Sequence, residues 1–90
     1  MFKTLEELIA VIRQRKESSV QESYTSKLLR DKKLSVGKIK EEIAELIEAV
    51  EENKKQVHEA ADVLYHLMVL LEANGIKIED VMDELKKRQK

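Results

Sequence analysis

Residues 41–71 read EEIAELIEAVEENKKQVHEAADVLYHLMVLL, and this run sets the fold class of the chain. Apolar residues recur at helical spacing on both sides of the polar triplet at 53–55, which predicts two helices joined by a tight turn. Each helix carries an acidic pair spaced i, i+3, so both members of a pair lie on one face. The pairs are Glu42 with Glu45 and Glu59 with Asp62. Antiparallel packing brings the four carboxylates toward one spot that suits Mg²⁺.

The composition of the whole chain agrees with a helical fold. Proline is absent, only two glycines occur, and 39% of the residues are charged against 42% hydrophobic. Ninety residues form one domain at most, and a chain of this size buries a small core unless a second copy packs against it. We therefore predict an all-α fold in a single domain over residues 1–90, a bundle of four to five helices completed by homodimerisation.

Charge and hydropathy exclude several classes of partner. The 17 basic and 18 acidic residues nearly cancel, so the sequence offers no basic surface for nucleic acid and no polybasic membrane anchor. No segment reaches the roughly 18 uninterrupted apolar residues of a membrane span, and the N-terminus reads as an amphipathic helix. Cysteine is absent, which excludes disulfides and thiolate metal sites. We expect a cytoplasmic protein with no nucleic-acid and no membrane partner.

The remaining elements follow from capping signals. Thr4 with Glu7 forms a capping box for the first helix, and Ser23 and Ser35 are expected to cap the second and third. Gly75 is expected to end the fourth, because glycine adopts the left-handed conformation of a C-terminal cap most easily. The expected helices cover 4–16, 23–31, 36–52, 56–74 and 79–88, with a polar break at 17–22 and a turn at Asn53, Lys54 and Lys55.

On the helix at 36–52, helical geometry separates acidic residues that can form a site from acidic residues that face water. One apolar stripe is formed by Ile39, Ile43, Leu46, Ile47 and Val50. Glu41 and Glu48 fall almost opposite this stripe and are expected to be solvated. Glu42 and Glu45 lie to one side of it, with the small Ala49 between them in angle, where a neighbouring helix can approach. Taken alone, this helix is equally compatible with a solvated acidic face.

The helix at 56–74 favours a metal. Between Ala60 and Leu71 only Asp62 and His66 are polar, so the helix is expected to be central. A carboxylate in such surroundings costs several kcal/mol unless it is paired or bound to a metal, and this helix has no lysine or arginine. Metal binding is the preferred interpretation. The alternative is a salt bridge from Lys38 or Lys40 on the preceding helix.

Other polar residues have less specific roles. His66 could be a ligand, an acid/base group or a donor to a ligand, but a satisfied histidine near the core is the preferred interpretation. His58 is expected at the surface, and Tyr65 and Met68 in the core stripe. Among the cations, the candidates for contacts with phosphate are Lys27, Arg30 and Lys38, for each of which a solvated role is the simpler alternative.

The acidic pattern resembles that of a known group of enzymes. EExxE followed by ExxD, here at Glu41, Glu42, Glu45, Glu59 and Asp62, is the metal-binding pattern of the all-α, MazG-like nucleotide pyrophosphohydrolases. Within that group the chain looks most like the phosphoribosyl-ATP pyrophosphohydrolase family of histidine biosynthesis. The strings that carry this resemblance are SYTSKLL at 23–29, EEIAELIEAV at 41–50, EAADVLYHLMVLL at 59–71 and GIKIEDVMDELKKR at 75–88.

The resemblance implies an enzyme that hydrolyses phosphoribosyl-ATP to phosphoribosyl-AMP and pyrophosphate. It also implies Mg²⁺ bound by Glu42, Glu45, Glu59 and Asp62, and a helical homodimer. Glu41 is a candidate general base by its place in the motif, although its outward angle argues against that role. Two alternatives stay open: a MazG-like pyrophosphatase acting on other nucleoside triphosphates, and a non-catalytic helical dimerisation module whose acids only solvate it.

Overall fold

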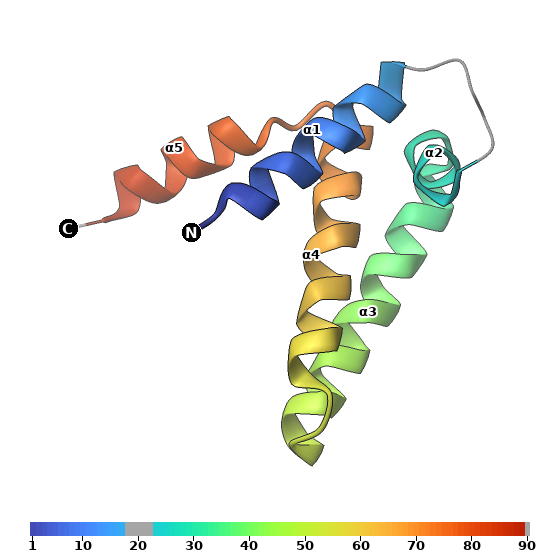
Figure 1. The fold of residues 1–90 in the computed structure, drawn as a ribbon, viewed down its shortest axis with the longest axis vertical. Helices are drawn as coiled ribbons and strands as arrows, with labels where there is room; N and C mark the ends of the chain where they lie inside the picture. Colours follow the sequence, from blue (N-terminus) through green and yellow to red (C-terminus); the bar gives the residue numbers. More distant parts are fainter. Residues whose placement is uncertain (18–22, 90) are drawn as a thin grey trace.

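The structure is a computed structural model that describes residues 1–17 and 23–89, and these residues form five α-helices (Figure 1). The helices are α1 (Lys3–Glu17), α2 (Tyr24–Arg30), α3 (Lys32–Glu52), α4 (Gln56–Ala73) and α5 (Ile78–Arg88). The all-α prediction is confirmed. The polar break expected at 17–22 lies almost wholly outside the described residues. None of the described helices combines the length and the apolar character needed to cross a lipid bilayer.

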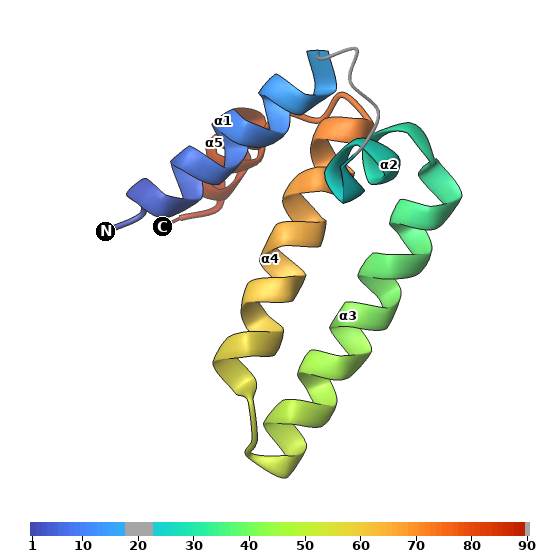
Figure 2. The ribbon, with the colours of Figure 1, turned by 45° about the vertical axis from the view of Figure 1, so that its right-hand side comes forward.

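The centre of the molecule is an antiparallel hairpin of α3 and α4, with α1, α2 and α5 gathered around the end away from its turn (Figures 1 and 2). Helix α4 contacts all four other helices, as its apolar circumference predicts. The expected turn is present, and Asn53 and Lys55 adopt left-handed φ values of 59° and 54°. The Asn53 amide donates to Ala49 O and Val50 O and ends α3.

Of the three predicted N-terminal caps, two are wrong and one is right. The third helix begins at Lys32 rather than Val36, because the Asp31 side chain caps it by accepting from the Leu34 amide at 3.1 Å. Ser35 lies buried inside that helix instead of capping it. Thr4 likewise lies within α1, which begins at Lys3. Ser23 caps α2 as predicted, since its Oγ accepts from the Ser26 amide at 3.0 Å.

The hydrophobic core lies where α1, α2 and α4 meet. Its buried members are Ile12, Leu28, Met68 and Val69, and Tyr65 packs against them. Met68 and Tyr65 were expected in the core, so that prediction is confirmed. Gly75 has a positive φ of 71° just after α4, which fits the expected glycine at this helix end. The chain can then turn into α5.

The side of α3 that faces α4 differs from the predicted stripe. Buried or half-buried residues follow one another at spacings of four and three, in the order Ser35, Ile39, Glu42, Leu46 and Ala49. We call this line of residues the seam. Ile43, Ile47 and Val50, predicted to lie with Ile39 in the stripe, are 44%, 54% and 57% exposed. The small Ser35 and Ala49 are the buried ends of the seam, where α4 can approach closely. The acidic side of α3 therefore turns inward.

A cluster of charged side chains joins three helices at the end of the hairpin away from its turn. Arg13 on α1 donates from Nε to Glu72 Oε2 at 2.9 Å and from Nη2 to Glu79 Oε1 at 2.6 Å. Lys16 Nζ donates to Glu72 O at 2.6 Å, at the last turn of α4. We call Arg13, Glu72 and Glu79 the Arg13 network. It ties α1, α4 and the start of α5 together.

Candidate metal centre

Three of the four predicted metal ligands converge between α3 and α4. Glu42, Glu45 and Glu59 each offer a carboxylate oxygen, and these oxygens lie within 4.8 Å of one another. Glu42 and Glu59 are half-buried, and Glu45 is exposed. Glu42 belongs to the seam, so its side chain is directed at α4 by the packing of α3. We call these three residues together with Asp62 the acidic cluster.

Asp62 extends the acidic cluster by one turn of α4 rather than sharing the same spot. It groups with Glu59 and His58 within the same 4.8 Å limit, so Glu59 connects the two groups. His58 is exposed, as expected, and its Nε2 lies 3.4 Å from Asp62 Oδ2. This contact was not predicted, although the spacing i, i+4 on one helix is the signal that reveals it.

The acidic cluster is short of partners from the chain. Glu42 Oε2 and Glu59 Oε2 are both buried, and neither has a hydrogen-bond partner among the described residues. Burial raises the pKa of the Glu42 carboxyl, and the adjacent Glu45 raises it further, while His66 opposes the shift. Buried, unpaired carboxylate oxygens are costly. A hard divalent cation such as Mg²⁺ fits this all-oxygen donor set and relieves the cost.

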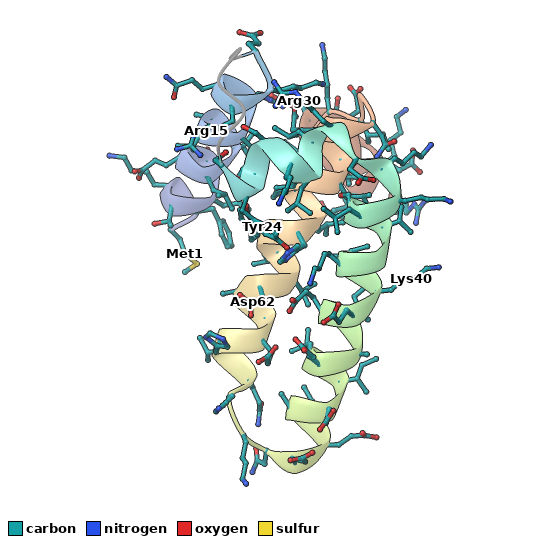
Figure 3. All side chains as sticks on the ribbon, turned by 90° about the vertical axis from the view of Figure 1, so that its right-hand side faces the viewer. Met1, Arg15, Tyr24, Arg30, Lys40 and Asp62 are labelled. Carbon is teal, nitrogen blue, oxygen red and sulfur yellow. The ribbon has the colours of Figure 1, made fainter. Side chains whose placement is uncertain are left out.

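The salt-bridge alternative finds no support in the positions of the two lysines. Lys38 Nζ lies 3.6 Å from Glu41 Oε2, one turn along α3. Figure 3 shows Lys40 extending away from α4. Glu41 itself is 56% exposed, in agreement with the outward angle predicted for it. The candidate general base therefore lies on the rim of the site, paired with Lys38.

One turn of α4 beyond Asp62, α2 contacts α4 through aromatic side chains. Tyr24 Oη lies 3.0 Å from His66 Nε2, and His66 Nδ1 lies 2.8 Å from Asp62 O. His66 is buried, so the preferred interpretation of a satisfied histidine near the core is confirmed. The Tyr24 ring also stacks on Tyr65 with centroids 6.4 Å apart. Tyr24 was not predicted as a site residue, since 42 residues separate it from His66 along the chain.

Toward the hairpin turn, the acidic cluster opens into a cavity of about 400 Å³. Glu45 and Glu59 line this cavity together with Lys54 and Lys55 of the hairpin turn. Ammonium groups beside carboxylates are suited to a phosphate chain that a cation bridges. From the sequence, these lysines were predicted only as part of the turn. Their place in a turn between two helices that carry acidic pairs could have indicated that they lie near the same site.

The predicted phosphate-binding cations differ in how close they lie to the acidic cluster. Lys38 is near enough to Tyr24 to lower the pKa of that phenol, against the larger effect of burial, which raises it. Lys27 is exposed on α2, one turn beyond Tyr24. Arg30 lies at the top of the view in Figure 3, well apart from Asp62. Of the three, the structure brings Lys38 to the site and places Arg30 away from it.

The fold and the acidic cluster define a class: an all-α protein whose central hairpin presents acidic oxygen ligands for a divalent cation. The model of the family described as phosphoribosyl-ATP pyrophosphohydrolase matches residues 5–89. The chain belongs to this family.

Curated relatives of two lengths resemble the chain. It is 44% identical over 87 residues to the histidine biosynthesis bifunctional protein HisIE of Pyrococcus furiosus, a match that covers 96% of the chain and 41% of that relative. It is 41% identical over 93 residues to the phosphoribosyl-ATP pyrophosphatase of Metallosphaera sedula, with all of both chains covered. The corresponding protein of Pyrobaculum arsenaticum is 44% identical over 91 residues, covering 98% and 97%. The chain thus spans less than half of the bifunctional relative and nearly all of the shorter ones.

Proposed function

We propose that the chain hydrolyses phosphoribosyl-ATP to phosphoribosyl-AMP and pyrophosphate, as a Mg²⁺-dependent enzyme of histidine biosynthesis in the cytoplasm. The observation that carries the proposal is a pair of buried oxygens, Glu42 Oε2 and Glu59 Oε2, which face a common space from two helices and have no hydrogen-bond partner within 1–17 and 23–89. Membership of the phosphoribosyl-ATP pyrophosphohydrolase family supports the choice of substrate. Its relatives of similar length carry the name phosphoribosyl-ATP pyrophosphatase.

The reaction suits the residues that the hairpin presents. Glu42, Glu45, Glu59 and Asp62 would hold Mg²⁺, which neutralises charge on phosphate oxygens and makes a bound water more acidic. Hydrolysis of a phosphoanhydride then needs positioning and charge stabilisation more than covalent chemistry by the protein. Lys38 at one side, and Lys54 and Lys55 at the cavity, supply positive charge for the remaining phosphate oxygens.

A panel of substrates tests this proposal. Pyrophosphate release is measured from phosphoribosyl-ATP and from ordinary and deoxynucleoside triphosphates, each with Mg²⁺ and with a chelator. We expect release from phosphoribosyl-ATP to be the most efficient and to stop without the metal. Preference for another triphosphate would favour the MazG-like alternative. Absence of hydrolysis on every substrate would favour the non-catalytic dimerisation module.

We also propose that two copies form a homodimer through the hairpin. Ile43, Ile47 and Val50 share one exposed face of α3, and Val57 and Leu64 of α4 are 86% and 47% exposed. Apolar side chains in such a row favour removal from water. Among the described helices, only α4 lies beside the half of α3 nearer the hairpin turn, so a second copy is a fitting cover for its exposed face (Figure 2).

Ile47→Glu is the variant that tests the dimer. A buried isoleucine contributes about 1.5–3 kcal/mol, and a two-fold interface loses it twice, so we expect the Kd of the dimer to rise by at least about 100-fold. Sedimentation velocity across a concentration series measures this. Leu85→Glu makes the same change at a 49% exposed leucine on α5, and we expect it to leave the dimer intact. Equal behaviour of the two variants, or a monomeric wild type, would contradict the proposed interface.

A further inference from the structure

When His66 is neutral, its contact with Tyr24 has a fixed direction. Asp62 O is a carbonyl and can only accept, so the 2.8 Å contact requires the proton of a neutral His66 to sit on Nδ1. His66 Nε2 then carries a lone pair, and the Tyr24 hydroxyl donates to it at 3.0 Å. The Tyr24 oxygen is left with its lone pairs and no proton to offer. It is an acceptor on the side of the site that α2 covers.

The Tyr24 oxygen lies within electrostatic reach of the acidic cluster and of a cation. Partial burial is the largest cause that raises the pKa of Tyr24, and the charge of Glu42 adds to it, while Lys38 opposes it. The phenol therefore keeps its proton near neutral pH and holds the bond to His66. Its ring is positioned by the stack on Tyr65, so the oxygen has a defined place.

Because the Tyr24 oxygen can only accept, its further partner must be a hydrogen-bond donor. Phosphate oxygens are acceptors and gain nothing from another acceptor, and the carboxylates of the acidic cluster are acceptors too. A water molecule can donate both to the Tyr24 oxygen and to a carboxylate. Lys38, close to the same phenol, attracts the phosphate that such a water must attack.

We infer that the Tyr24 oxygen accepts a hydrogen bond from the hydrolytic water, and that His66 is the positioning residue that holds Tyr24 for this role. The inference rests on the proposed function. One O–H of the water points to Tyr24, and a lone pair faces the phosphorus. As the new P–O bond forms, the anhydride P–O bond breaks and its electron pair leaves with the departing phosphate oxygen. The proton that the water loses passes to a carboxylate of the acidic cluster, because a phenol that keeps its own proton cannot take another.

The chain contains a matched control for this inference. Beside the Tyr24–His66 contact, a second hydroxyl contact joins the same two helices, between Thr25 Oγ1 and Tyr65 Oη at 2.5 Å. Tyr24→Phe and Tyr65→Phe therefore delete the same atom from neighbouring bonds between α2 and α4, and Tyr65→Phe keeps the ring on which Tyr24 stacks. A purely structural role predicts that both variants lower the melting temperature and leave kcat per folded molecule unchanged.

Steady-state pyrophosphate release from phosphoribosyl-ATP with Mg²⁺ separates these outcomes. We expect Tyr24→Phe to lower kcat about tenfold with little change in KM, as loss of one hydrogen bond to the reacting water implies, and Tyr65→Phe to retain wild-type kcat. Equal kcat losses in the two variants, unchanged kcat in Tyr24→Phe, or an effect mainly on KM would overturn the inference while the active wild type upholds the proposed function. An inactive wild type would overturn both.

His66 is tested through a double-mutant cycle. If it acts only by holding Tyr24, His66→Phe lowers kcat in the wild type and has no further effect when combined with Tyr24→Phe. Additive losses in the double variant would contradict the positioning role. Circular dichroism and the melting temperature establish that each variant is folded. If His66→Phe does not fold, the comparison of Tyr24→Phe with Tyr65→Phe decides the inference.

Discussion

Two regions of this small protein bury acidic side chains, and they differ in whether those side chains are paired. In the Arg13 network, Glu72 is only 8% exposed and receives the Arg13 guanidinium at 2.9 Å. In the acidic cluster, Glu42 and Glu59 each have a buried oxygen without a hydrogen-bond partner in the described part of the chain. The first region satisfies its charge from within the molecule. The second has no such partner, in keeping with the metal site that we propose there.

The difference appears in the pKa values of the two regions. Arg13 lowers the pKa of Glu79 to about 2, chiefly through its hydrogen bonds. Burial and the neighbouring Glu45 raise the pKa of Glu42. A carboxylate with a lowered pKa stabilises the native state when charged, whereas one with a raised pKa stabilises it when protonated or bound. The pKa values therefore agree with a structural role for the paired acid and with the ligand-binding role that we propose for the acidic cluster.

The largest expected effect is on activity, and it belongs to the acidic cluster alone. Glu42→Gln, Glu45→Gln and Asp62→Asn should each lower kcat by about 100-fold or more, because each removes a charged metal ligand. The helical fold should remain, since removing a like charge relieves repulsion. Circular dichroism and pyrophosphate release measure the two properties. Glu51→Gln, at an exposed position of α3, is the control, and near-wild-type turnover in the cluster variants would contradict the metal assignment.

Sequence reasoning works well where the information is local. The acidic pairs, the hairpin turn and the capping role of Ser23 follow from spacings of a few residues, and the structure contains the turn and the cap where they were predicted. Helical periodicity also finds an apolar stripe on α3. It does not tell which side of the stripe has a neighbour, and so Ile43 and Ile47 turn out to be exposed.

Contacts between distant segments cannot be derived from such spacings. Arg13 meets Glu72 across 59 residues of chain, and Tyr24 meets His66 across 42. Nothing in the residues near Arg13 distinguishes it from the exposed Arg15 two positions later. The choice between them depends on how α1 crosses α4, which is a property of the packed core. The Tyr24–His66 contact was therefore missed because tertiary packing assembles it.

A metal-binding test sharpens the comparison between the two regions. A ligand that binds only the native state stabilises it by about 2.7 kcal/mol at 100 times its Kd, which raises the melting temperature of a domain of this size by roughly 10 °C or more. We expect Mg²⁺ to produce this shift in the wild type and in Arg13→Gln, but not in Glu42→Gln. Differential scanning fluorimetry with and without a chelator measures it. A shift that survives in Glu42→Gln would place the cation elsewhere.

A smaller effect, on stability alone, is expected in the Arg13 network. Arg13→Gln leaves Glu72 buried without its cation, and because Arg13 is 37% exposed, the loss should be about 1–2 kcal/mol rather than that of a fully buried pair. The melting temperature should fall by about 5–10 °C, with kcat per folded molecule unchanged. Arg15→Gln makes the same change in charge at an exposed site on α1 and should have little effect. A loss of activity in Arg13→Gln beyond its unfolded fraction would show that the two regions are coupled.

The smallest effect is the pH dependence contributed by Glu79, and its sign follows from the lowered pKa. The folded-state value of about 2 lies below the ordinary 4.5, so the contact with Arg13 contributes its full stability above about pH 4.5 and loses it as the pH falls toward 2. Glu79→Gln should therefore melt a few degrees below the wild type near neutral pH, and the two curves should converge between pH 4.5 and 2. Asp83→Asn, at an exposed position of the same helix, should show no such convergence. The effect should be small, because Glu79 is exposed and its charge is screened by solvent. A difference in melting temperature between Glu79→Gln and the wild type that stayed constant down to pH 2 would mean that the charge of Glu79 does not hold α5 to α1.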